Sequence, residues 1–237
     1  MPTPAGNLAC DEALLNDREA NGGPGILRFW ESATCFIVVG YANKVAAETD
    51  LLTCEKSAVP ILRRCTGGGS VVQGPGCLNY SLILPIDAIP DAAANITGTN
   101  RFVMDRNRAA CEALAGRPIE VAGHTDLVVD GRKFSGNSQR RRREWFLFHG
   151  TFLYKFDLAV LERWLRPPPR QPEYRRHRSH AEFVTQLPAG ADQIKAALRR
   201  EWRAEEEFER EALPRIEVEI GRLTRERYER DEWNRKW

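Results

Sequence analysis

Apolar residues recur along the chain with two spacings, one typical of helices and one typical of strands. The helical spacing predicts helices at residues 7–22, 45–58, 101–115, 158–165 and 190–210. Asn7 is a candidate N-cap for the first of these, and the backbone freedom of Gly22 and Gly23 suits its end. Asp157 is a candidate cap for the fourth helix, which a run of prolines then stops.

Short runs rich in β-branched and aromatic residues predict strands between these helices. They lie at residues 26–31, 35–40, 59–65, 77–85, 119–123, 126–136 and 145–156. A small polar turn joins the first two runs, which therefore predict a hairpin. Asp130 and Gly131 predict a two-residue turn in which both residues need positive φ, and this turn places Lys133 just beyond it.

The order of these elements predicts the fold class. Strands and helices interleave without a regular βαβ rhythm, so we expect an α+β fold with mixed, mainly antiparallel sheets flanked by helices. The 237 residues can bury a substantial core, and no repeat or low-complexity linker divides them. We therefore expect residues 1–237 to form a single domain.

Composition and charge exclude several classes of protein. Apolar residues make up 42% of the chain and charged residues 29%, which is typical of a globular protein. The net charge is +2, and much of the arginine alternates with glutamate near the C-terminus, as on a solvated helix face. No apolar run approaches the ~18 residues of a membrane helix, and the first residues do not form a secretory signal. We expect a cytoplasmic protein that binds neither nucleic acid nor a membrane.

The cysteines predict neither a zinc site nor a disulfide framework. No CxxC pair and no His/Cys cluster occurs, so we expect free thiols in a reducing compartment. The six residues are Cys10, Cys35, Cys54, Cys65, Cys77 and Cys111.

Two stretches contain candidate functional residues. RRCTGGGSVVQGPG (63–76) offers successive backbone N–H groups able to cradle an anion, with Arg63 and Arg64 at its edge. It fits neither a Walker loop nor a dinucleotide fingerprint, and glycine content alone would also fit a flexible loop. The second stretch, GRKFSGNSQR, contains Lys133 among glycines and small polar residues, although a lysine after a turn is also commonly just solvated.

Together these stretches resemble the lipoate-protein ligase A family of the biotin/lipoate protein ligase superfamily. RRCTGGGSVVQGPGCLNYSLILP is similar to the family's RRxSGGGAVxHDxGNxNxS. HTDLVVDGRKFSGNSQRRRREWFLFHGTFL is similar to NDLxxxGKKxSGxAxxxxxxxxxHHGTLL. The resemblance extends from NLACDEALL to ERYERDEWN, so it covers nearly the whole chain.

The resemblance implies a two-step reaction with ATP and Mg²⁺. Lipoate and ATP give lipoyl-adenylate, and a carrier lysine then takes the acyl group as AMP leaves. The family pattern implies that Lys133 is catalytic and touches both the acyl carbonyl and the phosphate, where negative charge develops. Further residues that match lipoyl-binding positions are Arg64, Thr66, Gly67, Gly68, Gly69 and Arg140. Residues that match nucleotide-binding positions are Ser70, Val71, Val72, Gln73, Asp126 and Lys133, and Asp126 is also the candidate Mg²⁺ ligand.

The chain departs from the family pattern around the glycine-rich stretch. Gln73 and Gly74 replace the usual His-Asp, Cys77 replaces an asparagine, Cys65 stands after the arginines, and His149 is the only histidine where the family often has two. These departures leave the nucleotide contacts and the preferred acid open. Lipoate, octanoate and another acid all remain candidates.

Two other functions remain open. An octanoyl- or lipoyltransferase would use a cysteine thioester instead of ATP. Neither the region downstream of Cys111 nor PIEVAGHTD contains the cysteine of such relatives, but Cys65 and Cys77 border the glycine-rich stretch. A non-catalytic carrier-binding module is the second alternative. Biotin ligase is disfavoured because its GRGRxGRxW run is missing.

The resemblance also implies the partners. The acceptor would be a lipoyl-carrier protein, either an E2 lipoyl domain or a glycine-cleavage H-type protein. The chain ends at DEWNRKW, where many ligases continue into an accessory domain. We therefore expect a catalytic domain with no C-terminal accessory domain, and a separate accessory protein that could replace it.

Overall fold

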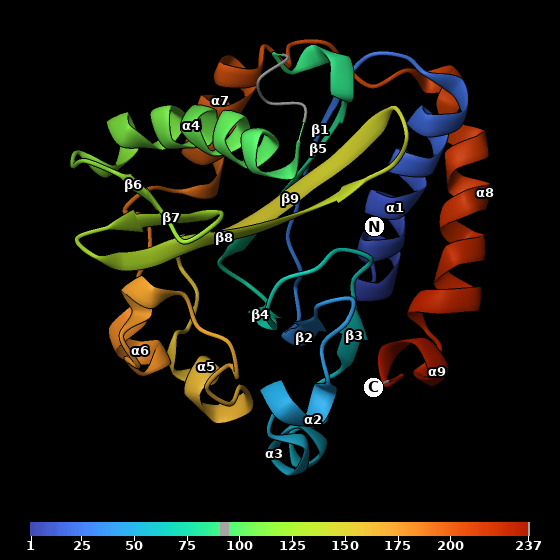
Figure 1. Cartoon of the computed structure of the whole chain (residues 1–237). Helices are drawn as coiled ribbons and strands as arrows, with labels where there is room; N and C mark the ends of the chain where they lie inside the picture. Colours follow the sequence, from blue (N-terminus) through green and yellow to red (C-terminus); the bar gives the residue numbers. More distant parts are fainter. Residues whose placement is uncertain (91–94, 237) are drawn as a thin grey trace.

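A computed structural model describes residues 1–90 and 95–236, whose strands form two sheets (Figure 1). The larger sheet is antiparallel in the order β1-β5-β9-β8-β7-β6. Its strands are β1 (Ile26–Trp30), β5 (Cys77–Pro85), β6 (Glu120–Ala122), β7 (Asp126–Val129), β8 (Arg132–Arg141) and β9 (Trp145–Leu153). In the smaller sheet, β2 (Phe36–Val39) runs parallel to β3 (Ile61–Arg63) and antiparallel to β4 (Val71–Gln73). This arrangement confirms the α+β fold with mixed, mainly antiparallel strands.

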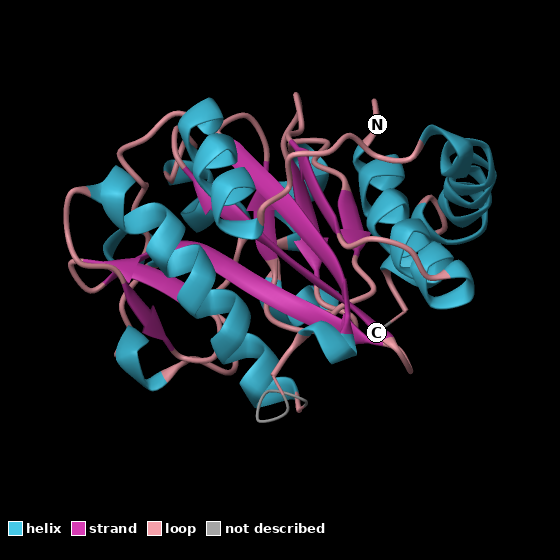
Figure 2. Cartoon of the chain, turned by 90° about the horizontal axis from the view of Figure 1, so that it is seen from above, coloured by secondary structure: helices cyan, strands magenta, loops and turns pink. Residues whose placement is uncertain are grey.

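Two pairs of longer helices pack against the larger sheet. Helices α1 (Pro4–Asn21) and α8 (Leu213–Leu223) pack together, as do α4 (Ile96–Ala115) and α7 (Ala191–Trp202). The strand residues alternate between the two sides, as a half-buried pleat requires. In β9, Phe146 and Phe148 join the core of α4 and α7, whereas Trp145 and Leu147 join the core of α1 and α8. Seen from above, helices lie to both sides of the strands (Figure 2).

Short helical segments complete the chain (Figure 1). Residues from α2, α3, α5 and α6 pack around the smaller sheet in a third core. The remaining turns connect these elements or follow α8. The bounds are α2 (Val45–Glu48), α3 (Leu51–Lys56), η1 (Ile86–Ala88), α5 (Ala159–Trp164), η3 (Glu173–Arg175), α6 (His180–Phe183), η4 (Arg210–Ala212), the π-helical turn η5 (Thr224–Tyr228) and α9 (Asp231–Asn234).

The predicted hairpin of residues 26–31 and 35–40 is wrong. Strand β1 pairs with β5, where Ile26 faces Ile83, and β2 leaves for the smaller sheet. Strand β2 lies between β3 and β4, at the centre of the smaller sheet, and all four of its residues are buried. A continuous apolar run does not indicate which strand it pairs with.

Four predicted helices differ from the observed ones. The helix predicted at 101–115 begins earlier, at Ile96, because Asn95 Oδ1 accepts a hydrogen bond from the Gly98 N–H at 2.8 Å. Helix α1 starts at Pro4, because Thr3 Oγ1 accepts a hydrogen bond from the Gly6 N–H at 3.0 Å, and Asn7 lies inside the helix. The segment 45–58 divides into α2 and α3, because Asp50 caps a new helix by accepting from the Thr53 N–H at 2.9 Å. The segment 190–210 is helical only to Trp202, where Arg203 takes a φ of 51°.

The predicted turn before Lys133 is confirmed. Asp130 and Gly131 have φ values of 50° and 71°, and Lys133 is the second residue of β8. Each of the six cysteines is a free thiol. Among the described residues, no helix is both long and apolar enough to cross a membrane.

Candidate functional site

Lys133 on β8 pairs with Asp126 on the neighbouring strand β7 of the larger sheet. Its Nζ lies 2.7 Å from Asp126 Oδ1, with the two side chains 27% and 14% exposed. Gly136 makes this possible, because a Cβ there would stand 2.6 Å from Lys133 Nζ. The other carboxylate oxygen of Asp126 accepts a hydrogen bond from the Tyr174 hydroxyl at 2.6 Å. Burial and the neighbouring Asp126 raise the pKa of Tyr174, which keeps this hydroxyl a donor.

The backbone of Lys133 is held by the segment that follows α6. Thr185 N–H donates to the Lys133 carbonyl at 2.8 Å, and Lys133 forms a parallel bridge with Val184. The backbone of Lys133 is therefore held by both β7 and the segment after α6, which leaves its partly exposed side chain to meet a ligand. A partly exposed ammonium on a fixed backbone can meet an anion without large rearrangement.

Arg64 shapes the glycine-rich loop, residues 66–70, from within. Its Nε donates to the Gly67 carbonyl at 3.0 Å, and its Nη2 donates to the Gly69 carbonyl at 2.9 Å. Burial lowers the pKa of Arg64 to about 10, so the guanidinium remains charged at neutral pH. Gly68 takes a φ of +84°, and a Cβ there would stand 2.9 Å from Arg64 Nη2. The loop conformation thus depends on this arginine.

A carboxylate already engages the end of the loop. Glu48 Oε2 accepts hydrogen bonds from the Ser70 N–H at 2.7 Å and from the Ser70 hydroxyl at 2.6 Å. Asn43 Nδ2 donates both to Glu48 Oε1 at 2.7 Å and to the Gly68 carbonyl at 2.9 Å. The two donors of Ser70 that were predicted to lie near a nucleotide therefore hold an anionic group of the chain itself.

Hydrogen bonds join the loop to β8, the strand that contains Lys133, and to its neighbour β9. Ser138 Oγ, on β8, donates to the Gly67 carbonyl at 2.9 Å. Thr66 Oγ1 lies 2.7 Å from Nε2 of His149 on β9, and the His149 Nδ1 lies 3.2 Å from Asp11 Oδ2. Burial alone would raise the pKa of Asp11, but Arg28 and His149 more than offset it and hold that pKa below its usual range. The structure therefore brings the loop and the Lys133 strand together.

The predicted nucleotide-binding residues of β4 differ in what they can offer. Val72 is 2% exposed and packs in a core, which leaves only its backbone for a ligand. Gln73, which replaces the family histidine, is also buried, and its Nε2 donates to Thr151 Oγ1 at 2.6 Å. Thr151 in turn donates to Asn79 Oδ1 at 2.6 Å. The nucleotide contacts of Val71, Val72 and Gln73 stay predictions.

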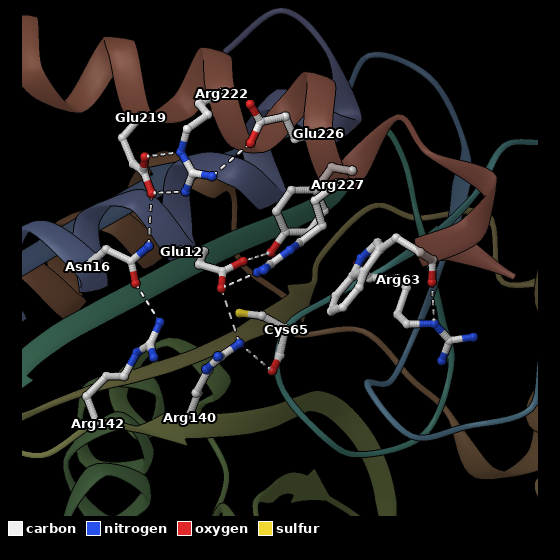
Figure 3. A network of polar contacts seen from close by, with 12 residues as sticks. Glu12, Asn16, Arg63, Cys65, Arg140, Arg142, Glu219, Arg222, Glu226 and Arg227 are labelled. Atoms are coloured by element: carbon white, nitrogen blue, oxygen red, sulfur yellow. Dashed lines mark hydrogen bonds and ion pairs between the residues drawn. The ribbon is translucent and has the colours of Figure 1, made fainter. Parts of the chain in front are cut away.

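Arg140 lies in a second charged cluster (Figure 3). Its Nη1 donates to Glu12 Oε1 at 3.2 Å and to the Cys65 carbonyl at 3.3 Å. Glu12 is 1% exposed, and it also accepts from Arg227 Nη1 at 2.6 Å and from the Tyr228 hydroxyl at 2.7 Å. The C-terminal turn η5 therefore contributes directly to the surroundings of Arg140. We call Glu12, Arg140, Arg227 and Tyr228 the Glu12 cluster.

The structure adds residues that the sequence patterns did not single out. Asp11 and Glu12 lie in NLACDEALL, which predicts only a helix. Both are buried in the structure. Because buried acids need partners, two acids within an apolar helix are a sequence signal that could have pointed to them. Glu48 and Tyr174 carry no recognisable motif. Asp126 stands with Lys133 and Tyr174, and no group of three potential metal ligands occurs among the described residues.

The thiols are poorly suited to nucleophilic attack. Burial raises the pKa of all six cysteines, and for Cys65 the value is about 11. Cys77 is fully buried and Cys65 is 6% exposed. A catalytic cysteine normally has a lowered pKa and an accessible sulfur.

Curated relatives include two kinds of enzyme. The chain is 32% identical over 159 residues to a probable lipoate-protein ligase A from Mycoplasma pneumoniae, an overlap of 67% of this chain but only 45% of the relative's length. It is 26% identical over 268 residues to octanoyltransferase LipM from Halalkalibacterium halodurans, covering 98% and 94% of the two chains.

Solved structures share the fold across nearly the whole chain. A putative lipoate protein ligase from Thermoplasma acidophilum with bound lipoic acid has a TM-score of 0.82 at 22% identity, covering 100% and 96% of the two chains. A structure described as a bi-partite lipoate protein ligase and its E2 lipoyl domain, also from T. acidophilum, has a TM-score of 0.81 at 24% identity, covering 99% and 93%. A lipoate-protein ligase A bound with ATP has a TM-score of 0.80 at 24% identity, covering 98% and 94%.

A family model for the lipoyl protein ligase A/B catalytic domain matches residues 3–203, most of the chain. This range contains the glycine-rich loop, Asp126, Lys133 and Arg140, which the sequence motifs singled out. The resemblance predicted from those motifs is confirmed, and the chain belongs to the lipoyl protein ligase A/B catalytic domain family.

Proposed function

We propose that this chain is an ATP-dependent lipoate-protein ligase, which converts lipoate or octanoate to the acyl-adenylate and transfers the acyl group to one lysine of a carrier. The observation that carries the proposal is the Lys133 ammonium, which is partly exposed, paired with Asp126 and located on the strand that hydrogen-bonds to the glycine-rich loop through Ser138. The raised pKa of every thiol is the supporting observation.

Each step of the proposed reaction develops negative charge that these residues can meet. When the carboxylate of the acid attacks the α-phosphate, charge grows on the phosphate oxygens as pyrophosphate leaves. When the carrier amine attacks the acyl carbon, charge grows on the carbonyl oxygen and AMP departs. A positioned ammonium and loop amides stabilise both, and losing one such donor typically costs on the order of 10²-fold in rate.

Two groups must exchange partners for this to happen. Lys133 would leave Asp126 for the substrate, and Ser70 would release Glu48 if a phosphate takes the Ser70 donors. Both exchanges replace a carboxylate by another anion. In this proposal Arg64, Thr66, Gly67 to Gly69 and Arg140 lie along the acyl group, and Ser70 to Gln73 lie along the nucleotide.

Mg²⁺ enters this proposal with the nucleotide, as part of the substrate. Asp126 alone cannot form a resident magnesium site, because both its oxygens have protein partners and one is an ammonium 2.7 Å away. Mg²⁺ usually takes one or two carboxylates together with substrate phosphates. Asp126 could therefore supply one ligand after Lys133 has moved to the phosphate.

We propose a lipoyl-carrier protein as the acceptor, either an E2 lipoyl domain or a glycine-cleavage H-type protein, in the cytoplasm. The T. acidophilum structure described as a bi-partite ligase with its E2 lipoyl domain supports both this acceptor and a separate accessory protein. Such a protein would speed adenylation by excluding water and orienting the acid against the phosphate.

Octanoyl transfer through a thioester is the alternative with a specific observation in its favour, because an octanoyltransferase aligns over 98% of this chain. A non-catalytic carrier-binding module would not need Lys133 and the loop to be held together. The test is ATP–pyrophosphate exchange with lipoate and with octanoate, with and without a candidate accessory protein. Exchange that depends on the acid supports the ligase. Complete absence of exchange under all four conditions, with acyl transfer from a thioester donor, supports the transferase.

A further inference from the structure

A chain of buried and half-buried polar side chains crosses the larger sheet and ends beside Asp126. Trp202 Nε1, at the end of α7, donates to Asn107 Oδ1 at 2.9 Å, and Asn107 Nδ2 donates to the Tyr80 hydroxyl at 2.7 Å. The Tyr80 hydroxyl donates to Asn137 Oδ1 at 2.6 Å. Asn107 and Tyr80 are fully buried. Buried polar groups impose a cost unless they are satisfied, so a fully connected chain fixes each of its members.

Gly150 allows Asn137 to reach Tyr80. Asn137 is on β8, Tyr80 is on β5, and β9 lies between them with Gly150 facing both residues. A Cβ at Gly150 would stand within 1.7 Å of Asn137 Oδ1. The Asn137 carboxamide therefore passes over β9 at a position that has no side chain. This gives a structural role to Gly150, the glycine of the HGT motif.

The chemistry of the chain sets the direction of every hydrogen bond. An indole N–H can only donate, so Asn107 must present its carbonyl oxygen to Trp202 and its amide NH₂ to Tyr80. Burial raises the pKa of Tyr80 well above its usual range, so its hydroxyl keeps its proton and donates it onward. Asn137 must then accept through Oδ1, which leaves its NH₂ group facing the other way.

That NH₂ group holds the residue before Asp126. Asn137 Nδ2 donates to the Thr125 carbonyl at 2.6 Å, and Thr125 Oγ1 donates back to the Asn137 carbonyl at 2.8 Å. These two bonds tie the turn before β7 to β8. Asp126 follows directly, with its carboxylate on Lys133.

We propose that Asn137 is a positioning residue for the catalytic lysine: Trp202, Asn107 and Tyr80 orient its carboxamide, which fixes Thr125 and so aims Asp126 at Lys133. The inference rests on the proposed function, because it assigns Asn137 a role through Lys133. It gives the end of α7 a part in positioning Lys133, because the Trp202 indole acts on Asp126 through Asn107, Tyr80 and Asn137.

The test compares Asn137→Leu and Tyr80→Phe with the control Tyr154→Phe. Tyr154→Phe also removes a phenol hydroxyl, which donates to Glu31 at 2.8 Å, but Tyr154 lies outside the chain from Trp202 to Thr125. With synthetic lipoyl-AMP and a lipoyl domain, we expect kcat to fall about tenfold for Asn137→Leu and a few-fold for Tyr80→Phe, because a misplaced catalytic group loses rate steeply. We expect KM for the lipoyl domain and the rate of Tyr154→Phe to stay unchanged.

A double-mutant cycle separates positioning from general loosening of the fold. In an Asp126→Asn background, adding Asn137→Leu should change kcat less than twofold, because the residue it acts through is already altered. A full tenfold loss in that background would overturn the proposal. So would a wild-type rate in a folded Asn137→Leu variant.

A second readout needs no enzymatic activity, so it remains decisive if the proposed function fails. Acetic anhydride labelling followed by peptide mass spectrometry measures the reactivity of Lys133 against the exposed Lys56. We expect Lys133 to be labelled several-fold faster in Asn137→Leu and in Tyr80→Phe than in Tyr154→Phe, because its contact with Asp126 is loosened. Equal labelling in all three folded variants would contradict the positioning role even if no variant, nor the wild type, transfers an acyl group.

Discussion

The two charged ends of the candidate site hold their carboxylates differently. At one end, Asp126 and Lys133 form a pair that is 14% and 27% exposed. At the other, Glu12 is 1% exposed and accepts from Arg140, Arg227 and Tyr228 (Figure 3). An ion pair near solvent contributes little net free energy, whereas leaving a buried group without its partners is costly.

This difference separates the part of the site that can change from the part that holds its shape. Lys133 can exchange Asp126 for a substrate anion at small cost. Glu12 cannot leave its partners, so it fixes Arg140 against α1 and the C-terminal turn. We infer that the reaction takes place at the Lys133 end and that the Glu12 cluster holds β8, α1 and the C-terminal turn together.

The largest expected effect comes from Lys133→Ala. Removal of the ammonium should lower acyl transfer from lipoyl-AMP on the order of 10²-fold or more, because a charge-stabilising donor is lost. Its free energy of unfolding should change by less than about 1 kcal/mol, since the pair is partly exposed. Stopped-time mass spectrometry of the carrier and thermal unfolding measure the two effects, with the exposed Lys56→Ala as control. A normal rate in Lys133→Ala would remove the proposed mechanism.

The Glu12 cluster should respond in the opposite way. Glu12→Gln should lower the free energy of unfolding by about 2 kcal/mol, because a buried acceptor of charged hydrogen bonds is weakened. The matched substitution Glu219→Gln, in a pair with the half-exposed Arg222, should cost less than about 1 kcal/mol. Denaturant unfolding of the two variants gives the comparison. Equal costs would mean that the cluster is no more than a surface pair.

The fold and the candidate site differ in how far the sequence predicts them. The Asp130–Gly131 turn and the α+β class follow from local patterns, and both are confirmed. The loop and Lys133 come from contiguous motifs, and the structure joins them through Ser138. Whether each residue of those motifs binds the acyl group or the nucleotide stays a prediction.

Long-range partners were not predictable. Arg63 was expected to bring charge to the edge of the loop, but it is fully buried. Its Nη1 donates to the Gly40 carbonyl at 2.8 Å and its Nη2 to the Asn234 carbonyl at 3.1 Å. These partners are far away in the sequence, and the alternating Arg/Glu pattern of the C-terminal segment hides the apolar face of α8. Local spacing cannot show which side chain a distant segment will cover.

Gly68→Val tests the loop between the two ends. The added side chain would collide with Arg64 and occupy a φ of +84°, which β-branched residues avoid, so affinity for lipoyl-AMP should fall about tenfold or more. Calorimetry measures this affinity. Gly190→Ala, where a Cβ would stand 3.6 Å from Gln193 Oε1 and φ is −78°, should bind as the wild type does. Unchanged affinity in Gly68→Val would place the ligand elsewhere.

The smallest effects should come from the cysteines beside the loop. Cys65→Ser and Cys77→Ser should each keep the ATP-dependent rate within a few-fold of the wild type, because buried thiols with a raised pKa are poor nucleophiles. Intact-mass measurement of the wild type with an acyl donor serves as the companion experiment. Near-complete loss in one variant, together with a trapped acyl-thioester in the wild type, would assign the reaction to that cysteine.

The most direct test of the adenylate mechanism is a donor competition with the wild-type chain and a lipoyl domain. Synthetic octanoyl-AMP and an octanoyl thioester of a carrier protein are supplied together, one with an isotope-labelled acyl chain, and the mass of the modified lipoyl domain reports which donor was used. The adenylate mechanism predicts that the acyl group comes from octanoyl-AMP and that Lys133→Ala abolishes this transfer. Modification from the thioester alone, unaffected by Lys133→Ala, would contradict it.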